Sequence, residues 1–207
     1  GGIASSVWDK DALAAQQNNG QTYNAFPTGQ TAPVQINADG NVISPVVAIA
    51  EAVTPAIVGI TNKATVRNYF GQVGEATVGT GSGVIFREDG YIVTNYHVIE
   101  GATSLSVSLA DGRIVDGVVV GTDETTDLAV VKIDADNLTA AVFGDSDQLK
   151  VGELAVAIGN PLGDEFARTV TSGIISGTDR TIQAEDRTYK VIQTDAAINS
   201  GNSGGAL

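Results

Sequence analysis

Short runs rich in β-branched residues alternate along this chain with turn signals, and this alternation is the feature that most constrains its fold. The turn signals include REDGY, ADGR and GTDETTD, which carry Asp or Gly where a bend needs them. One short helix is expected, in SPVVAIAEAV before Pro55. Many short strands with little helix indicate an all-β barrel or sandwich. The predicted strands lie near residues 56–62, 76–86, 91–94, 104–109, 113–120, 128–133, 153–159, 169–176 and 188–194.

The composition changes near residue 45 and divides the chain. Residues 1–45 are rich in Gln, Asn, Gly, Thr and Ala, which is typical of an arm or linker. The strands that follow form two units, residues 46–144 and residues 145–207. The stretch AVFGDSDQLKVGE is the natural connection between these two units.

The charge balance excludes some partners. Lys and Arg total 11 against 24 for Asp and Glu, which gives a net charge of −13. Such a chain repels the phosphates of nucleic acids and of anionic membrane surfaces, so we expect no nucleic-acid partner. The chain has no cysteine and no apolar run near the ~18 residues of a membrane span. It opens with GGIASS, without methionine, so we expect a trimmed start, and any export signal or anchor would belong to the removed part.

A glycine-flanked serine, GNSGG, lies near the end of the chain. Gly201 can turn its N–H inward without a Cβ clash, and Gly204 and Gly205 allow a close approach of another chain. The amides of Gly201 and Ser203 could then stabilise an oxyanion, each donor contributing roughly 3 kcal/mol to an acyl-transfer barrier. The alternative is a glycine-rich turn with a solvent-facing serine.

The chain has a single histidine, His97, in YIVTNYHVIEGA. A zinc site usually needs two or three imidazoles or thiolates, so we expect no metal site, and acyl transfer by a serine would need no cofactor. A lone histidine is often a structural or surface residue. His97 follows an apolar strand where the chain turns, however, and a serine nucleophile needs a base of near-neutral pKa.

Asp127 is the best candidate for the acid that orients His97. It lies between the polar turn GTDETT and the apolar strand LAVVKI, so its side chain can point inward. Asp123 and Glu124 lie in the turn itself and are expected to be solvated. Asp195 is a rival that more naturally braces the loop of the serine. The resulting chain order is His, Asp, Ser, as in the chymotrypsin-like template.

Two other patterns carry no site. The glycine-rich GTGSGVIF at 79–86 leads into a strand instead of a helix, so it is interpreted as a bulged strand and not as a phosphate loop. The stretch GDSDQ lacks the further oxygen ligands of a calcium loop.

Five motifs occur together and in order: TNYHVIEGA, TDLAVVKID, VGELAVAIGNPLG, VTSGIIS and TDAAINSGNSGGAL. Over residues 46–207 the chain resembles the HtrA (DegP-type) serine proteases, a branch of the chymotrypsin-like fold. The resemblance implies an all-β fold of two six-stranded antiparallel β-barrels with the site between them. It also implies catalytic roles for His97, Asp127 and Ser203 and an oxyanion hole of Gly201, Asn202 and Ser203, in which Asn202 shapes the turn.

The same resemblance extends to specificity and to loops. Trypsins carry an acid six residues before the nucleophile, where this chain has Ala197. With Ile198 it implies a pocket for a small or medium aliphatic side chain. NKATVRNYFGQVGEA corresponds to a loop that often reaches a neighbouring subunit, SGTDRTIQAEDRTYK to an activation-sensing loop, and PLGDEFAR to a loop that it contacts. Relatives are typically trimers built through N-terminal regions, so Tyr23 and Phe26 are candidates for contacts.

The chain also departs from the family pattern. Relatives continue past GNSGGAL with further strands and usually a peptide-binding domain. The second barrel is therefore expected to be incomplete here, with about four of its six strands, the missing segment being a separate piece or unrecorded. Ser200 stands where many relatives carry proline, with no expected loss of chemistry.

The resemblance implies an extracytoplasmic endopeptidase, in the cell envelope or periplasm, that cleaves unfolded or damaged proteins in protein quality control. It also implies a membrane anchor that has been removed from the N-terminus. One alternative is an inactive chaperone-like or peptide-binding fragment of the same fold. Another is a glutamyl endopeptidase, which would need a second histidine that this chain lacks.

Overall fold

The computed structural model describes residues 44–67, 73–160, 169–184, 187–199 and 201–207. Residues 1–43 with Tyr23 and Phe26, the segment PLGDEFAR at 161–168 and Ser200 lie outside these residues. The described part begins with helix α2, Pro45–Val53, which continues into a 3-10 turn, Thr54–Ala56. Pro45 suits the first helical position because a proline there loses no hydrogen bond.

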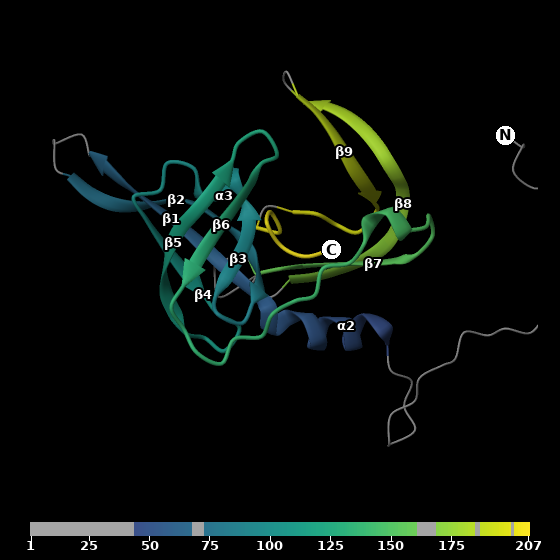
Figure 1. Ribbon diagram of the computed structural model, residues 1–207, viewed down its shortest axis with the longest axis horizontal. Coiled ribbons are helices and arrows are strands. Elements are labelled where there is room, and N and C mark those ends of the chain that lie inside the picture. The colour runs from purple at the N-terminus through teal and green to yellow at the C-terminus, as the bar shows by residue number, and fades with distance from the viewer. Residues whose placement is uncertain (1–43, 68–72, 161–168, 185–186, 200) are drawn as a thin grey trace, which may run out of the picture. The chain divides into compact units, whose positions relative to one another are not determined.

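Six antiparallel strands close into a barrel, coloured blue to green in Figure 1. Their order around the barrel is β1-β2-β3-β6-β5-β4, and β1 closes the barrel by pairing with β4. The strands are β1 (Ile57–Arg67), β2 (Val73–Arg87), β3 (Tyr91–Asn95), β4 (Ser104–Ser108), β5 (Ile114–Asp123) and β6 (Leu128–Ile133).

The core of this barrel follows from the alternation of side chains along a strand. In β3, β4 and β6 every second residue is buried, and the buried ones are mostly Val, Ile or Leu. The core contains Val58, Ile60, Ile85, Ile92, Leu105, Val107, Val131 and Ile133. The pattern of β-branched residues therefore specifies which face of each strand turns inward.

A second, three-stranded antiparallel sheet follows, in the order β7-β8-β9. Its strands are β7 (Leu154–Gly159), β8 (Thr169–Ala184) and β9 (Arg187–Thr194). β7 is buried along nearly its whole length, and Val156 and Ile158 pack with Ile57 and Val84 of the barrel. Ile158 also bridges to Ala206. The prediction of an all-β fold with one complete barrel and an incomplete second one is confirmed.

Two local predictions are wrong. β8 was expected to end near residue 176 but continues to Ala184 and pairs with β9 over most of SGTDRTIQAEDRTYK. Register shifts between Ile175 and Arg180 absorb the polar residues that suggested a loop. In addition, a one-turn helix, α3 (Tyr96–Ile99), follows β3 where only a turn was expected.

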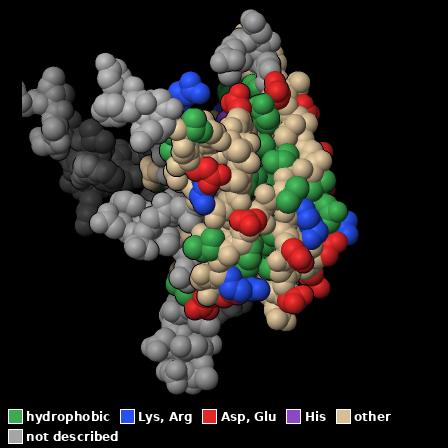
Figure 2. Space-filling view, turned by 90° about the vertical axis from the view of Figure 1, so that its left-hand side faces the viewer, with side chains coloured by type: hydrophobic (Ala, Val, Ile, Leu, Met, Phe, Trp, Pro, Cys, Tyr) green, Lys and Arg blue, Asp and Glu red, His purple; other side chains and the backbone are tan. Residues whose placement is uncertain are grey.

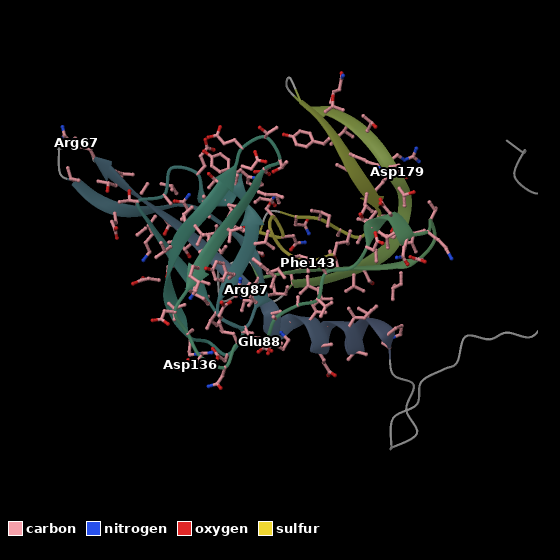
Figure 3. All side chains as sticks on the ribbon, viewed as in Figure 1. Arg67, Arg87, Glu88, Asp136, Phe143 and Asp179 are labelled. Atoms are coloured by element: carbon pink, nitrogen blue, oxygen red, sulfur yellow. The ribbon has the colours of Figure 1, made fainter. Side chains whose placement is uncertain are left out.

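Between β6 and β7 the chain crosses from the barrel to the second sheet through residues 134–153, with a 3-10 turn at Ser146–Gln148. Phe143, labelled in Figure 3, packs on Phe86 of β2 with their ring centroids 5.9 Å apart. Asp145 caps the 3-10 turn by accepting a hydrogen bond from the amide of Asp147. No helix among the described residues combines the length and apolar character that a membrane span requires.

Candidate active site

His97 and Asp127 contact each other because β3 and β6 are neighbours in the barrel. Asn95 pairs with Leu128 across these strands, so the residues just beyond them, in α3 and in the turn before β6, are adjacent. Nδ1 of His97 lies 2.7 Å from Oδ2 of Asp127. The backbone N–H of His97 donates to Oδ1 of the same carboxylate, at 2.9 Å. Both carboxylate oxygens are therefore engaged by one residue, which orients the imidazole.

The backbone of Asp127 has an unusual conformation, with φ at 55° in the left-handed region. Asp tolerates this region better than most residues. The carbonyl of Asp127 accepts two hydrogen bonds, from the N–H of Tyr96 and from Nδ2 of Asn95, each at 3.0 Å. These contacts stabilise the turn that directs the carboxylate towards His97. Asn95 could not be predicted from the sequence, because a neutral side chain in a turn has no distinctive chemistry.

The rival acids of the preceding turn have other partners. Asp123 accepts hydrogen bonds from the hydroxyl of Thr126 and the N–H of Thr125, each at 2.9 Å. These two hydrogen bonds, the Thr126 hydroxyl first, lower the pKa of Asp123. Glu124 accepts from the hydroxyl of Tyr96 at 3.0 Å, and this hydrogen bond raises the pKa of the Tyr96 phenol. Both acids are exposed, as predicted.

Asp195 braces its own loop, as predicted. Its Oδ1 accepts the N–H of Ile174 in β8 at 2.7 Å. Thr194, one residue earlier, donates its hydroxyl to the carbonyl of Ile174 at 2.8 Å. Together these two hydrogen bonds attach the segment that leads to Ser203 to strand β8.

Ser203 lies in a turn formed by residues 201–205, which we call the serine turn. Two glycines of this turn have a positive φ, Gly201 at 101° and Gly204 at 81°. The carbonyl of Asn202 accepts the N–H of Gly205 at 2.8 Å. Within the described residues, the amides of Gly201 and Ser203 donate to no other group. The turn thus leaves two backbone donors available for a ligand oxygen.

The serine turn lies against the barrel. A Cβ on Gly204 would meet the carbonyl oxygen of Ser82 and Oγ1 of Thr94, so only glycine fits there. A Cβ on Gly81 would lie 3.1 Å from the carbonyl oxygen of Ser203 and within 3 Å of the methyls of Val98, the residue after His97. The serine turn and α3 therefore flank the same stretch of β2.

In the described part of the chain, no hydrogen bond joins the imidazole of His97 to the hydroxyl of Ser203. Catalytic hydrogen bonds are often long in ligand-free enzymes and shorten when substrate binds. The side chain of His97 is 54% exposed, so it faces an open site.

Ala197 and Ile198, the predicted pocket residues, are both exposed. The carbonyl of Ala197 accepts hydrogen bonds from Oγ1 of Thr171 at 2.8 Å and from Nδ2 of Asn202 at 3.4 Å. These contacts link the segment to β8 and to the serine turn. A specificity role for the two residues stays a prediction.

Ser82 is a second residue that sequence analysis missed. It lies inside GTGSGVIF, which is part of strand β2 as predicted, with a register shift against β1 beside Gly79. Ser82 is completely buried and contacts the serine turn. The flanking glycines, Gly81 and Gly83, could have indicated a closely packed position, because a Cβ on either of them would clash with neighbouring side chains.

The described residues contain no group of three His, Asp or Glu side chains that could hold a metal ion. The described site brings together a hydroxyl, an imidazole beside a carboxylate, and two N–H groups that donate to no other described residue.

Comparison with known proteins agrees with this geometry. The family model of the trypsin-like peptidase domain matches residues 81–207. The chain therefore belongs to the trypsin-like peptidase domain family. Within this family its relatives are of HtrA type. It is 51% identical over 174 residues to the serine protease Do-like HtrA of Bacillus subtilis, covering 77% of this chain and 39% of that protein.

Two further matches point the same way. The probable periplasmic serine endoprotease DegP-like of Halomonas elongata is 55% identical over 127 residues, covering 61% of this chain and 26% of that protein. The solved structure of the HtrA-type protease AlgW with a decapeptide matches with a TM-score of 0.67 and 39% identity, over 79% of this chain and 55% of that one. The chain thus spans less than two thirds of the length of these relatives.

Proposed function

We propose that this protein is an HtrA-type serine endopeptidase that hydrolyses peptide bonds through an acyl-enzyme. The observation that carries the proposal is the pairing of both Asp127 carboxylate oxygens with the N–H and Nδ1 of His97. With its proton on Nδ1, the imidazole presents a lone pair at Nε2. That lone pair accepts the proton of the Ser203 hydroxyl as its oxygen attacks the scissile carbonyl.

The tetrahedral intermediate carries a negative oxygen, which the amides of Gly201 and Ser203 stabilise, while Asn202 shapes the turn between them. His97 then donates its proton to the leaving amine and the acyl-enzyme forms. Water repeats these steps and releases the product. Asp127 stabilises the imidazolium in both halves of the reaction. The reaction needs no cofactor.

Unfolded or damaged polypeptides are the proposed substrates. A half-exposed His97 leaves room for an extended chain, and the related protease AlgW was solved with a decapeptide. Ala197 and Ile198 offer no charge to a basic side chain, which supports cleavage after a small or medium aliphatic residue. On the face that Figure 2 shows, the described acidic side chains lie scattered among hydrophobic groups and a few Lys and Arg. This distribution suits polypeptide ligands better than nucleic acid.

The proposal extends to location and assembly. A relative from Halomonas elongata carries a periplasmic designation, which supports a place in the cell envelope, with a role in protein quality control. A homotrimer is proposed from the HtrA-type relationship, and sedimentation of the purified protein would test it.

The experiment that tests the function is labelling with a fluorophosphonate, followed by intact-mass and peptide analysis. We expect a single adduct on Ser203 and cleavage of an unfolded protein such as reduced casein. The variants Ser203→Ala and His97→Ala should lose both. Binding of unfolded protein without labelling would instead support the chaperone-like alternative and overturn the enzymatic proposal.

A further inference from the structure

Ser82 joins three segments that lie far apart in the sequence. It belongs to β2 and its side chain is fully buried. Its Oγ donates a hydrogen bond to the carbonyl of Gly201 at 2.5 Å, across 119 positions of sequence. The same oxygen accepts the N–H of Asn160, at the end of β7, at 2.8 Å. The hydroxyl has one proton to donate, and it goes to the serine turn.

The backbone of Ser82 makes a second contact with the serine turn. Its N–H donates to the carbonyl of Ser203 at 2.8 Å. Its own carbonyl accepts the hydroxyl of Thr94 at 2.6 Å, which holds this part of β2 against β3. One buried residue therefore binds the carbonyls of Gly201 and Ser203, the two residues whose amides are proposed to stabilise the oxyanion.

A peptide group is planar, so fixing its carbonyl also fixes its N–H, which points the opposite way. The peptide between Gly201 and Asn202 is held at both ends, since its carbonyl accepts from Ser82 and its N–H donates to the carbonyl of Asn199 at 3.0 Å. Gly201 has a positive φ and no side chain to restrict it. Without the hydroxyl of Ser82, no described group donates to the carbonyl of Gly201, and this peptide keeps only the hydrogen bond from Asn202 to Asn199.

We propose that Ser82 is a positioning residue for the serine turn, an inference that rests on the proposed serine-protease function. Its hydroxyl holds the peptide between Gly201 and Asn202. In this orientation the amides on either side of that peptide, those of Gly201 and Ser203, face the substrate oxygen. The N–H of Asn160 polarises this hydroxyl and strengthens its bond to Gly201, because hydrogen bonds in a chain reinforce one another. Ser82 touches neither substrate nor the reacting atoms.

The test compares Ser82→Ala with the unchanged protein, using the chain as its gene encodes it. Removing the hydroxyl loosens the turn but leaves both amides present. We expect kcat to fall between ten-fold and a hundred-fold, less than the 10²–10³-fold loss from deleting an oxyanion donor outright. KM should stay within about two-fold, since Ser82 does not contact substrate, and the fluorophosphonate rate should fall in parallel with kcat. The pH midpoint of kcat/KM should not move, because the His97–Asp127 pair is untouched.

Two further variants separate positioning from general stability. Val107→Ala removes completely buried methyl groups from the core of the barrel, in β4, which pairs with β1 and β5 and not with the serine turn. We expect it to lower the melting temperature about as much as Ser82→Ala while keeping kcat within three-fold. Ser82→Cys keeps a weak donor in place and should recover part of the lost kcat. Should Ser82→Ala not fold, Ser82→Cys carries the test by itself, with a drop in kcat of at least three-fold expected.

The outcomes are distinguishable. If Ser82→Ala and Ser82→Cys keep kcat within three-fold while Ser203→Ala is inactive, the positioning role is wrong and the proposed function stands. An equal loss of kcat in Val107→Ala would also overturn it, because the effect would then follow from lost stability. If the unchanged protein neither hydrolyses peptide nor reacts with the fluorophosphonate, both proposals fall together.

Discussion

Replacing Asp127 with Asn tests how the carboxylate acts on His97. The backbone N–H of His97 needs an acceptor, and in the native protein Oδ1 fills that place at 2.9 Å. In the variant the amide oxygen must take the same place, which turns the amide NH2 towards Nδ1 of His97. Nδ1 then accepts a hydrogen bond, so the proton of the neutral imidazole moves to Nε2. That nitrogen can no longer accept the proton of Ser203.

The expected drop in kcat of Asp127→Asn follows from two free-energy costs. Restoring the active tautomer requires the amide to flip, which places two donors face to face and costs about 1–3 kcal/mol. The imidazolium of the transition state also loses a charged hydrogen bond of about 1.5–3 kcal/mol. Together these costs correspond to a drop in kcat of about 10²–10⁴-fold, the upper end being the value for a trypsin-type triad. The side chain of His97 is 54% exposed, and water weakens the second cost, so we expect about 10³-fold.

The assay is the hydrolysis of a peptide substrate, with thermal unfolding as a check that the fold is intact. Asn tolerates the left-handed backbone of Asp127, so stability should change little. Asp195→Asn is the matched control, since Asp195 also accepts a backbone N–H but belongs to the β8 contact. We expect this control to stay within three-fold. A loss below ten-fold in Asp127→Asn, or an equal loss in Asp195→Asn, would refute the assignment.

Two further predictions concern stability and use urea unfolding. Gly204→Ala should lose about 2–5 kcal/mol, because a left-handed backbone costs about 1–2 kcal/mol and the new methyl overpacks against the carbonyl of Ser82. Gly121→Ala, whose methyl meets open space, should be near neutral, and equal stability of the two variants would contradict the packing argument. Asp123 has a lowered pKa in the folded protein, first because of the Thr126 hydroxyl, so it adds stability above the unfolded pKa of about 3.9 that is lost as the pH falls. The urea midpoint of Asp123→Asn should therefore fall less between pH 6 and pH 3 than that of the unchanged protein, and an equal fall would contradict the turn contact.

The fold was predictable where local pattern and tertiary structure agree. The first barrel follows the alternation of β-branched residues, so its strands were predicted to within a few residues, apart from the longer ends of the β1–β2 hairpin. The far half of β8 was not predictable because its bulges mix Gly, Thr and Asp into a strand. α3 is too short for a periodic signal and is held from outside, by Nδ2 of Asn62 on the carbonyls of Val98 and Glu100.

Some residues of the candidate site could likewise be predicted from the sequence, and others could not. His97, Asp127 and Ser203 have side chains with distinctive chemistry, and their motifs made them visible in the sequence. Ser82 and Asn95 act through hydrogen bonds to backbone carbonyls of residues that are distant in sequence. Any neutral polar residue could make such a bond, so only the three-dimensional arrangement distinguishes them.

The two halves of the site are held by different means. The His97–Asp127 pair lies in the open and depends on hydrogen bonds that water can replace. The serine turn is held from the inside of the molecule by Ser82, whose bonds are completely buried. Because the amide of Asn160 shares the hydroxyl of Ser82, the end of β7 and the serine turn cannot shift independently relative to β2. A displacement of β7 would therefore disturb the proposed oxyanion donors before it disturbed His97, whose described hydrogen bonds go to Asp127 in the turn before β6 of the barrel.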